Sequence, residues 1–156
     1  MKIIRISLIV MILLLSTSCS LNINEKSDIK NENNILEEHY YKESMTNKMK
    51  LIIDNNEYEI KLENNQTVLD LINMLPLNLN MKELNGNEKY VYLNDSLETN
   101  SYNPKHIEAG DVMLYGNNCL VIFYKSFDTS FSYTKIGHID NLPDLGSENV
   151  LIEIKD

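Results

Sequence analysis

Positive charge is scarce in this sequence. Lys and Arg together number 14 against 23 Asp and Glu, so the formal net charge is −9. Arg5 is the only arginine, and cleavage of residues 1–18, which hold Lys2 and Arg5 and no acid, would leave a chain of −11 without arginine. Nucleic-acid affinity comes from Lys and Arg that neutralise phosphates. The charge therefore excludes nucleic acid as a partner.

Motifs for metal, phosphate or nucleophilic chemistry are also missing. The histidines His39, His106 and His138 stand far apart, with no second His or Cys at the spacing of a metal site. The sequence has no glycine-rich phosphate loop, and no Ser, His and Asp set can be singled out. We therefore expect no metal, no cofactor and no catalytic residue of these kinds.

Cysteine is rare as well, with only Cys19 and Cys119 in the chain. If Cys19 carries lipid, Cys119 has no partner, and no disulfide is expected within the chain. Cys119 begins the apolar run that continues from Leu120 to Phe123. This setting favours a buried small hydrophobe over a reactive thiol.

Residues 1–18 have the order of a signal peptide. A basic start precedes an apolar stretch, Leu8–Leu15, and small polar residues stand directly before Cys19. The apolar stretch is shorter than the about 20 residues of a spanning helix. This arrangement resembles the lipobox of bacterial lipoproteins, which implies a diacylated Cys19 as the new N-terminus. Ordinary secretion, with cleavage nearby, is the alternative.

A polar segment, residues 19–48 including Cys19, separates the leader from the rest of the chain. It is rich in Asn, Glu, Lys and Ser, so it cannot bury enough apolar surface to offset its ordering entropy. We interpret it as a tether. Two acyl chains give stable membrane anchoring, so the expected location is the extracytoplasmic face of the cell membrane.

From residue 49 onward, short alternating apolar runs separated by turn residues predict one β-rich domain over residues 49–156. One amphipathic helix is expected over residues 67–75, with Thr67 as its cap and Pro76 as its end. Asn94 to Lys105 is expected to form a loop. The strands are expected at 50–53, 57–62, 77–81, 90–93, 111–115, 119–124, 132–139 and 150–154.

About eight strands and one helix indicate a mostly β fold. Closing such a sheet into a small barrel removes its exposed edges and fills the interior with side chains. We therefore predict a closed eight-stranded β-barrel. The apolar strand at 119–124 is expected to lie centrally.

The order of these pieces resembles bacterial cyclophilin-like domains from Met49 to Ile154. The pieces are the opening hairpin, the helix ending in Leu75-Pro76, Asn85 to Lys89, Ile107 to Val112, Leu120 to Tyr124, and Ile136 to Ile139. The resemblance implies the cyclophilin fold, a closed eight-stranded barrel with helical segments at its ends.

The isomerase residues of true cyclophilins do not carry over. The mature chain has no arginine to stabilise the twisted imide, and the strand from Cys119 to Tyr124 lacks the family's Gln. Tyr133 stands where the family has its groove His before Gly137. The resemblance therefore implies the fold without prolyl isomerase chemistry. A weak or divergent peptidyl-prolyl isomerase is the alternative.

Seven residues are candidates for a binding groove. Glu88 and Lys89 follow a turn, a place where a charged pair would stand at the barrel mouth, although a solvated surface pair is the simpler alternative. Aromatic side chains would bind a peptide or small ligand in a groove, or would simply fill the barrel. They are Tyr92, Tyr115, Phe123, Tyr124 and Tyr133.

The sequence thus favours a lipid-anchored, non-catalytic module of the bacterial cell envelope that binds a peptide or small ligand. An enzyme would need a polar group that converges on the tyrosines. A role in assembling a larger envelope complex is a third hypothesis.

Overall fold

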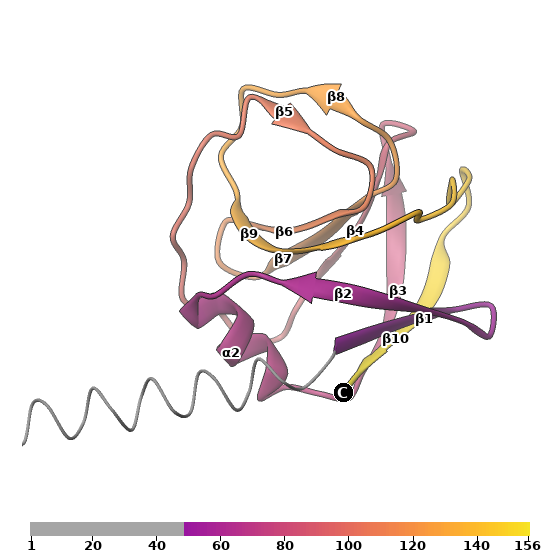
Figure 1. The fold of residues 1–156 in the computed structure, drawn as a ribbon, viewed down its shortest axis with the longest axis horizontal. Coiled ribbons are helices and arrows are strands. Elements are labelled where there is room, and N and C mark those ends of the chain that lie inside the picture. The colour runs from indigo at the N-terminus through magenta and orange to yellow at the C-terminus, as the bar shows by residue number, and fades with distance from the viewer. Residues whose placement is uncertain (1–48) are drawn as a thin grey trace, which may run out of the picture.

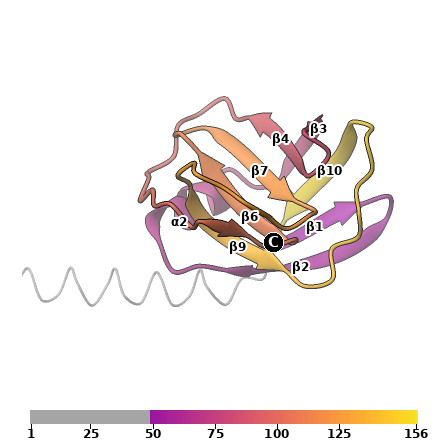
Figure 2. The same cartoon turned by 90° about the horizontal axis from the view of Figure 1, so that it is seen from above.

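Antiparallel pairing joins eight strands into a closed barrel in the computed structural model, which describes residues 49–156 (Figure 1). Around the barrel the order is β1-β10-β3-β4-β7-β6-β9-β2, and Figure 2 shows these strands as a ring. This confirms the predicted fold. The strands are β1 Met49–Ile53, β2 Asn56–Leu62, β3 Leu77–Leu84, β4 Glu88–Tyr92, β6 Asp111–Tyr115, β7 Cys119–Phe123, β9 Thr134–Ile139 and β10 Val150–Lys155.

The predicted leader, the lipid-attachment residue Cys19 and the tether lie outside the described residues. Among residues 49–156, no helix is long and apolar enough to cross a membrane.

The barrel interior is filled by alternate side chains of its strands. Every second residue of a strand points to the same face, so one face of each strand supplies the interior. The side chains that fill the interior form one hydrophobic cluster. Full burial of a large aliphatic side chain contributes about 1.5–3 kcal/mol, so this cluster is the main source of stability. It includes Met49, Leu51, Ile53, Ile60, Met81, Val112, Leu114, Leu120, Ile122, Ile136, Ile139, Ile152 and Ile154.

The one α-helix among residues 49–156, α2 (Gln66–Ile72), covers one end of the barrel, since its Val68 and Leu71 belong to the interior cluster. Its N-cap is Asn65, whose side chain accepts a hydrogen bond from the Val68 N–H. The prediction of Thr67 as the cap was wrong. Thr67 is buried, and its hydroxyl donates to the Glu98 carbonyl at 2.6 Å.

The helix also ends earlier than predicted, at Ile72. A residue that precedes proline is disfavoured in the helical region, so Leu75 could not continue the helix into Pro76. The chain leaves α2 through a turn in which Met74 and Leu75 donate to the Leu71 and Ile72 carbonyls.

Two turns agree with the sequence pattern. Asp54 and Asn55 take positive φ values of 48° and 64° between β1 and β2. Asn85 and Gly86, with φ values of 58° and 71°, connect β3 to β4. Asn and Gly tolerate this region better than other residues, which explains why they mark the hairpins in the sequence.

A second layer covers the outer face of β6 and β7. It contains a two-stranded sheet, β5 (His106–Ile107) paired with β8 (Phe127–Asp128), which the sequence pattern did not predict. In Figure 1 these strands lie at the top, away from β1 and β10. All of β7 is buried, because the interior covers one face and this layer covers the other. The outer cluster consists of Ile107, Met113, Cys119, Val121, Phe123 and Tyr133.

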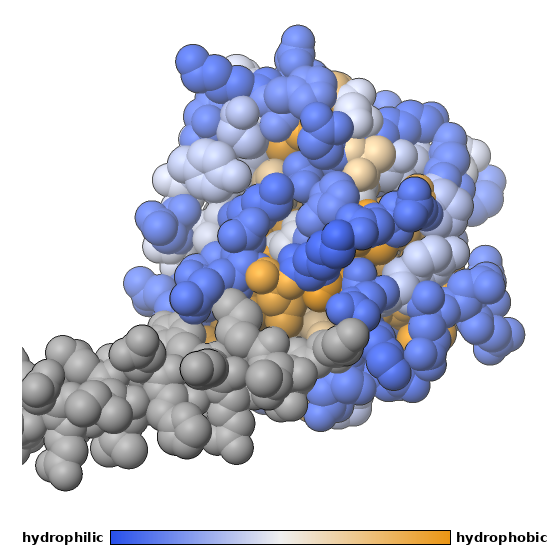
Figure 3. Space-filling model, in the orientation of Figure 1, coloured by the Kyte–Doolittle hydropathy of each residue, from blue (hydrophilic) through white to orange (hydrophobic). Residues whose placement is uncertain are grey.

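The surface is mainly polar on the face shown in Figure 3. Hydrophilic residues cover most of it, and apolar residues show in patches between them. Residues 49–156 hold eight lysines and no arginine against seventeen carboxylates, a net charge of −9.

Candidate functional site

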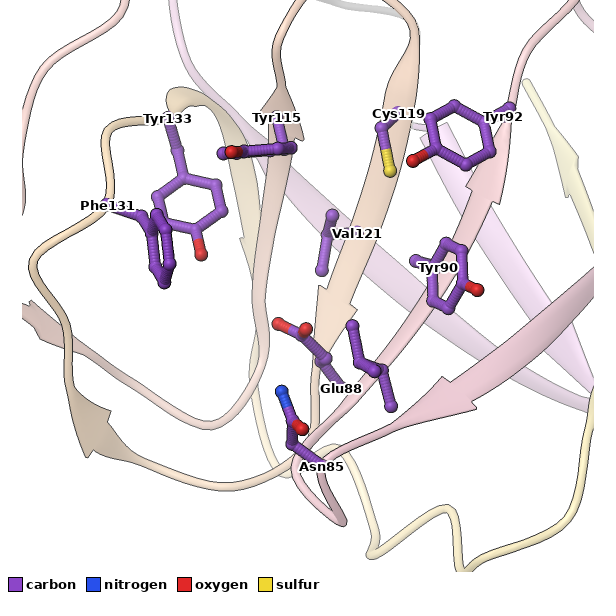
Figure 4. Close-up of a pocket in the computed structure, with 10 residues that line it drawn as sticks. Asn85, Glu88, Tyr90, Tyr92, Tyr115, Cys119, Val121, Phe131 and Tyr133 are labelled. Carbon is purple, nitrogen blue, oxygen red and sulfur yellow. The ribbon is translucent and has the colours of Figure 1, made fainter.

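A pocket of about 240 Å³ opens on the outer face of the barrel wall (Figure 4). Alternate side chains of β4 face this pocket, together with outward-facing side chains of β6 and β7 and two aromatic rings from the segment 129–133. The lining residues are Leu84, Asn85, Glu88, Tyr90, Tyr92, Tyr115, Cys119, Val121, Phe131 and Tyr133.

Exposed aromatic rings form the rim of the pocket. Tyr92, Tyr115 and Phe131 are 64%, 44% and 59% exposed. Large apolar side chains at this level of exposure are normal when scattered singly, whereas a gathered set marks a binding surface. Four of the six exposed large hydrophobic residues among those described line this one pocket.

The rings form two groups on opposite sides of the pocket (Figure 4). On one side, the Tyr115 ring lies 6.1 Å from Phe131 and 5.6 Å from Tyr133, measured between ring centroids. On the other side, Tyr90 and Tyr92 make an edge-on contact at 6.0 Å. All three spacings suit favourable aromatic pairs.

Tyr133 is held in place by its backbone and by the ring beneath it. Its N–H and carbonyl exchange two hydrogen bonds of 2.9 Å with Tyr102. Its ring packs edge-on against the fully buried Phe123, with centroids 5.5 Å apart. This wall of the pocket is therefore preformed.

Glu88 places a carboxylate in the pocket. The residue is only 8% exposed, and its side chain points between the two groups of rings (Figure 4). Within residues 49–156, it has no hydrogen bond and no ion pair. Burial, followed by the nearby charge of Glu83, raises the pKa of Glu88 above its ordinary value.

The charge of Glu88 also reaches its neighbours in the pocket. Burial raises the pKa of the Cys119 thiol and of the Tyr133 hydroxyl, and the Glu88 carboxylate adds to both shifts. The expected buried character of Cys119 is confirmed, since it is a free cysteine that is 5% exposed. A raised pKa keeps the thiol protonated and unreactive.

Lys89 does not line the pocket. Successive residues of a strand point to opposite faces, so Lys89 leaves β4 on the face opposite to Glu88. Its ammonium donates to the carbonyls of Gly146 at 2.6 Å and Glu148 at 2.7 Å. Lys89 is fully buried, so the alternative of a solvated surface pair was wrong. Removal from water lowers its pKa, opposed by nearby carboxylates, Glu83 first.

Phe123 and Tyr124 do not line the pocket either. Phe123 lies in the outer cluster under Tyr133. Tyr124 is 4% exposed, and the ammonium groups of Lys89 and Lys125 lie 5.1 and 5.4 Å from the centre of its ring. Both residues are buried and lie outside the lining of the pocket.

The structure thus brings four of the seven candidate residues together, namely Glu88, Tyr92, Tyr115 and Tyr133. Strict alternation along β4 would also have found Tyr90, which shares a face with Glu88 and Tyr92. Phe131 carries no such signal, since it comes from an irregular segment. Leu84 and Asn85, at the turn before β4, carry no such signal either. Val121 has the sequence pattern of a core residue.

The two described histidines contact carboxylates outside the pocket. His106 Nδ1 lies 2.6 Å from Asp128 Oδ1, and His138 Nδ1 lies 3.0 Å from Asp111 Oδ1. In the part of the chain that the structure describes, no three His, Cys, Asp or Glu side chains gather into a group that could hold a metal ion.

The described residues thus form a small closed-barrel domain. A helix covers one end of the barrel, and the pocket lies on its outer wall. Residues 51–155 match the model of the cyclophilin-like family. The chain belongs to the cyclophilin-like family. Neither a comparison with curated proteins nor one with solved structures gave a match.

Proposed function

We propose that this protein is a lipid-anchored module of the bacterial cell envelope that binds a peptide or small ligand on the extracytoplasmic side without catalysis. The observation that carries the binding role is the preformed pocket, in which exposed aromatic rings surround a buried carboxylate. Concave sites with apolar walls and a few convergent polar groups are the usual ligand sites of proteins. The order of the leader and Cys19 supports the anchor.

The anchor is tested by changing each cysteine separately in the full chain, expressed in a bacterial host. Cys19→Ser should release the protein into the medium, because the acylated thiol is lost. Cys119→Ser is the matched control and should stay with the membrane fraction. A Cys19→Ser protein that remains in the membrane would contradict lipid anchoring and favour an uncut N-terminal segment.

The binding role is tested with purified full-length protein and a library of short capped peptides. The chain has no Trp and nine Tyr, four of which line the pocket, so tyrosine fluorescence reports binding directly. Tyr92→Ala should weaken binding by about tenfold, since truncating an aromatic contact at a hot spot has an effect of this size. Tyr102→Ala is the matched control, because Tyr102 is 46% exposed and lies outside the pocket.

Two outcomes would contradict the proposal. If no peptide or small ligand binds, or if both tyrosine variants lose affinity equally, the pocket is not the binding site. If the protein accelerates cis/trans exchange of a proline peptide, the proposal that the module is non-catalytic is wrong.

A further inference from the structure

The pocket holds a negative charge that nothing in the described chain neutralises. Glu88 is more than nine-tenths buried and is aimed into the cavity, and its side chain has neither a hydrogen bond nor an ion pair within residues 49–156. A buried charge is costly unless it is paired. The nearest lysine in sequence, Lys89, points to the other face of β4 and is held by two backbone carbonyls. A cation from outside the domain would therefore neutralise Glu88.

The aromatic walls of the pocket also favour a positively charged ligand. The face of an aromatic ring is electrically negative, so a cation above it is attracted, most strongly when water is excluded. Rings stand on both sides of the carboxylate, with Tyr115 and Phe131 on one side and Tyr90 and Tyr92 on the other (Figure 4). An anion would meet repulsion from the rings and from Glu88 together.

The size of the pocket limits what can enter. Pockets for drug-sized ligands are about 300–1,000 Å³, and this one is about 240 Å³. It suits a single side chain or a small organic molecule. Its apolar floor, which includes Val121 and Cys119, suits an aliphatic stem.

We propose that this pocket binds an alkylammonium group, with Glu88 as the counter-charge and the tyrosine and phenylalanine rings as the surrounding cage. The inference rests on the proposed binding role and names its ligand class. The group is carried either by a lysine side chain of a peptide or by a free small amine.

The protonation of Glu88 makes the affinity of the site depend on pH. Burial raises the pKa of Glu88, and an ammonium beside the carboxylate favours its ionised form. Binding of the cation therefore releases protons when the pH lies near the folded-state pKa, and affinity falls as the pH decreases through it. A neutral ligand that accepts a hydrogen bond from protonated Glu88 would show the opposite dependence.

The experiment compares n-butylammonium with n-butanol, which has a similar shape and no charge, by calorimetry on full-length protein. The ammonium should bind at least about tenfold more tightly. Glu88→Gln should weaken the binding of butylammonium and so reduce this preference, since only the attraction of the rings for the cation remains. Glu63→Gln is the control, since it changes the net charge equally at an exposed position outside the pocket.

Two peptides distinguish the sources of the ammonium. Acetyl-Gly-Lys-Gly-amide should bind more tightly than the same peptide with an acetylated lysine. If the lysine peptide binds more tightly than butylammonium, the ligand is a peptide side chain, and the reverse order assigns a free amine.

The inference is overturned if butanol binds as well as butylammonium, or if Glu88→Gln leaves the affinity for the ammonium unchanged. Its failure differs from failure of the proposed function. Neutral or acidic peptides that bind with dependence on Tyr92 would remove the cation assignment alone. Absence of any binding at the pocket would remove both.

Discussion

Glu88 and Lys89 are neighbours in sequence, yet their charged groups stand on opposite faces of the barrel wall. The Glu88 carboxylate faces the aromatic pocket without a hydrogen-bond or ion-pair partner. Lys89 is fully buried, and its ammonium donates hydrogen bonds to the carbonyls of Gly146 and Glu148. The pleat of β4 separates the two charges. As a result, Lys89 has hydrogen-bond partners within the fold, and the Glu88 side chain faces the pocket without one.

Lys89→Met is expected to destabilise the domain by about 3 kcal/mol. The change removes two charge-assisted hydrogen bonds and leaves the Gly146 and Glu148 carbonyls without their donor. Urea unfolding at pH 7 measures the difference. Lys82→Met is the control, because Lys82 is exposed on β3, and its change should stay within about 0.5 kcal/mol. Equal effects of the two changes would contradict the structural role of Lys89.

Glu88→Gln is expected to make the domain more stable at pH 7. The folded-state pKa of Glu88 is raised above its ordinary value of 4.5, so the unfolded chain ionises first as the pH rises. Folding stability therefore falls as the pH rises from the unfolded-state pKa to the folded-state pKa of Glu88, and the loss persists above it. Each tenfold change in proton affinity corresponds to about 1.4 kcal/mol.

The advantage of Glu88→Gln should disappear below pH 4.5, where the wild-type carboxyl is protonated in both states. Unfolding curves from pH 4 to pH 7 for wild type and variant test this. A stabilised variant that no longer binds cations cannot owe its loss of binding to unfolding. A variant that is less stable at every pH would contradict the view that Glu88 is an unpaired buried charge.

Gly110→Ala is expected to cost about 3 kcal/mol or more. Gly110 has φ of +101°, and an added Cβ would lie 2.2 Å from the Ile139 carbonyl oxygen, a backbone atom that cannot move aside. Gly86→Ala is the control for backbone conformation alone, since Gly86 has φ of +71° and open space around it. It should cost about 1 kcal/mol. Thermal unfolding compares the two, and similar losses would show that the contact with Ile139 is unimportant.

Asn65→Ala is expected to cost about 1–2 kcal/mol. The Asn65 side chain caps α2 through the Val68 N–H and also donates to the Lys135 carbonyl at 2.8 Å. The adjacent Asn64 is exposed, so Asn64→Ala should change stability by less than about 0.5 kcal/mol. Urea unfolding of both variants measures the difference, and an equal response would argue against the cap.

Much of the fold could be predicted because its signals are local. Alternation between apolar and polar residues follows the two-residue repeat of a strand, and Asn and Gly mark turns that need positive φ. These signals located the eight barrel strands and the hairpins. The short strands β5 and β8 were missed, since a two-residue strand is too short to show any repeat.

The candidate site was only half predictable. Alternation along β4 assigns Glu88 and Tyr92 to one face, but it does not say whether that face is the interior or the outer wall. Phe123 and Tyr133 show the difficulty, since they touch each other while only Tyr133 lines the pocket. Which ring is covered depends on the second layer, whose position no local pattern encodes.

By itself, the sequence determined the β-rich class, the closure into eight strands and the scarcity of positive charge, because periodicity and composition act at every position along the chain. Only the tertiary structure decided which of two adjacent charges, Glu88 or Lys89, would be satisfied. Whether a buried charge finds a partner depends on atoms that are distant in sequence, such as the Gly146 and Glu148 carbonyls beside Lys89. Such partners come together only when the barrel closes.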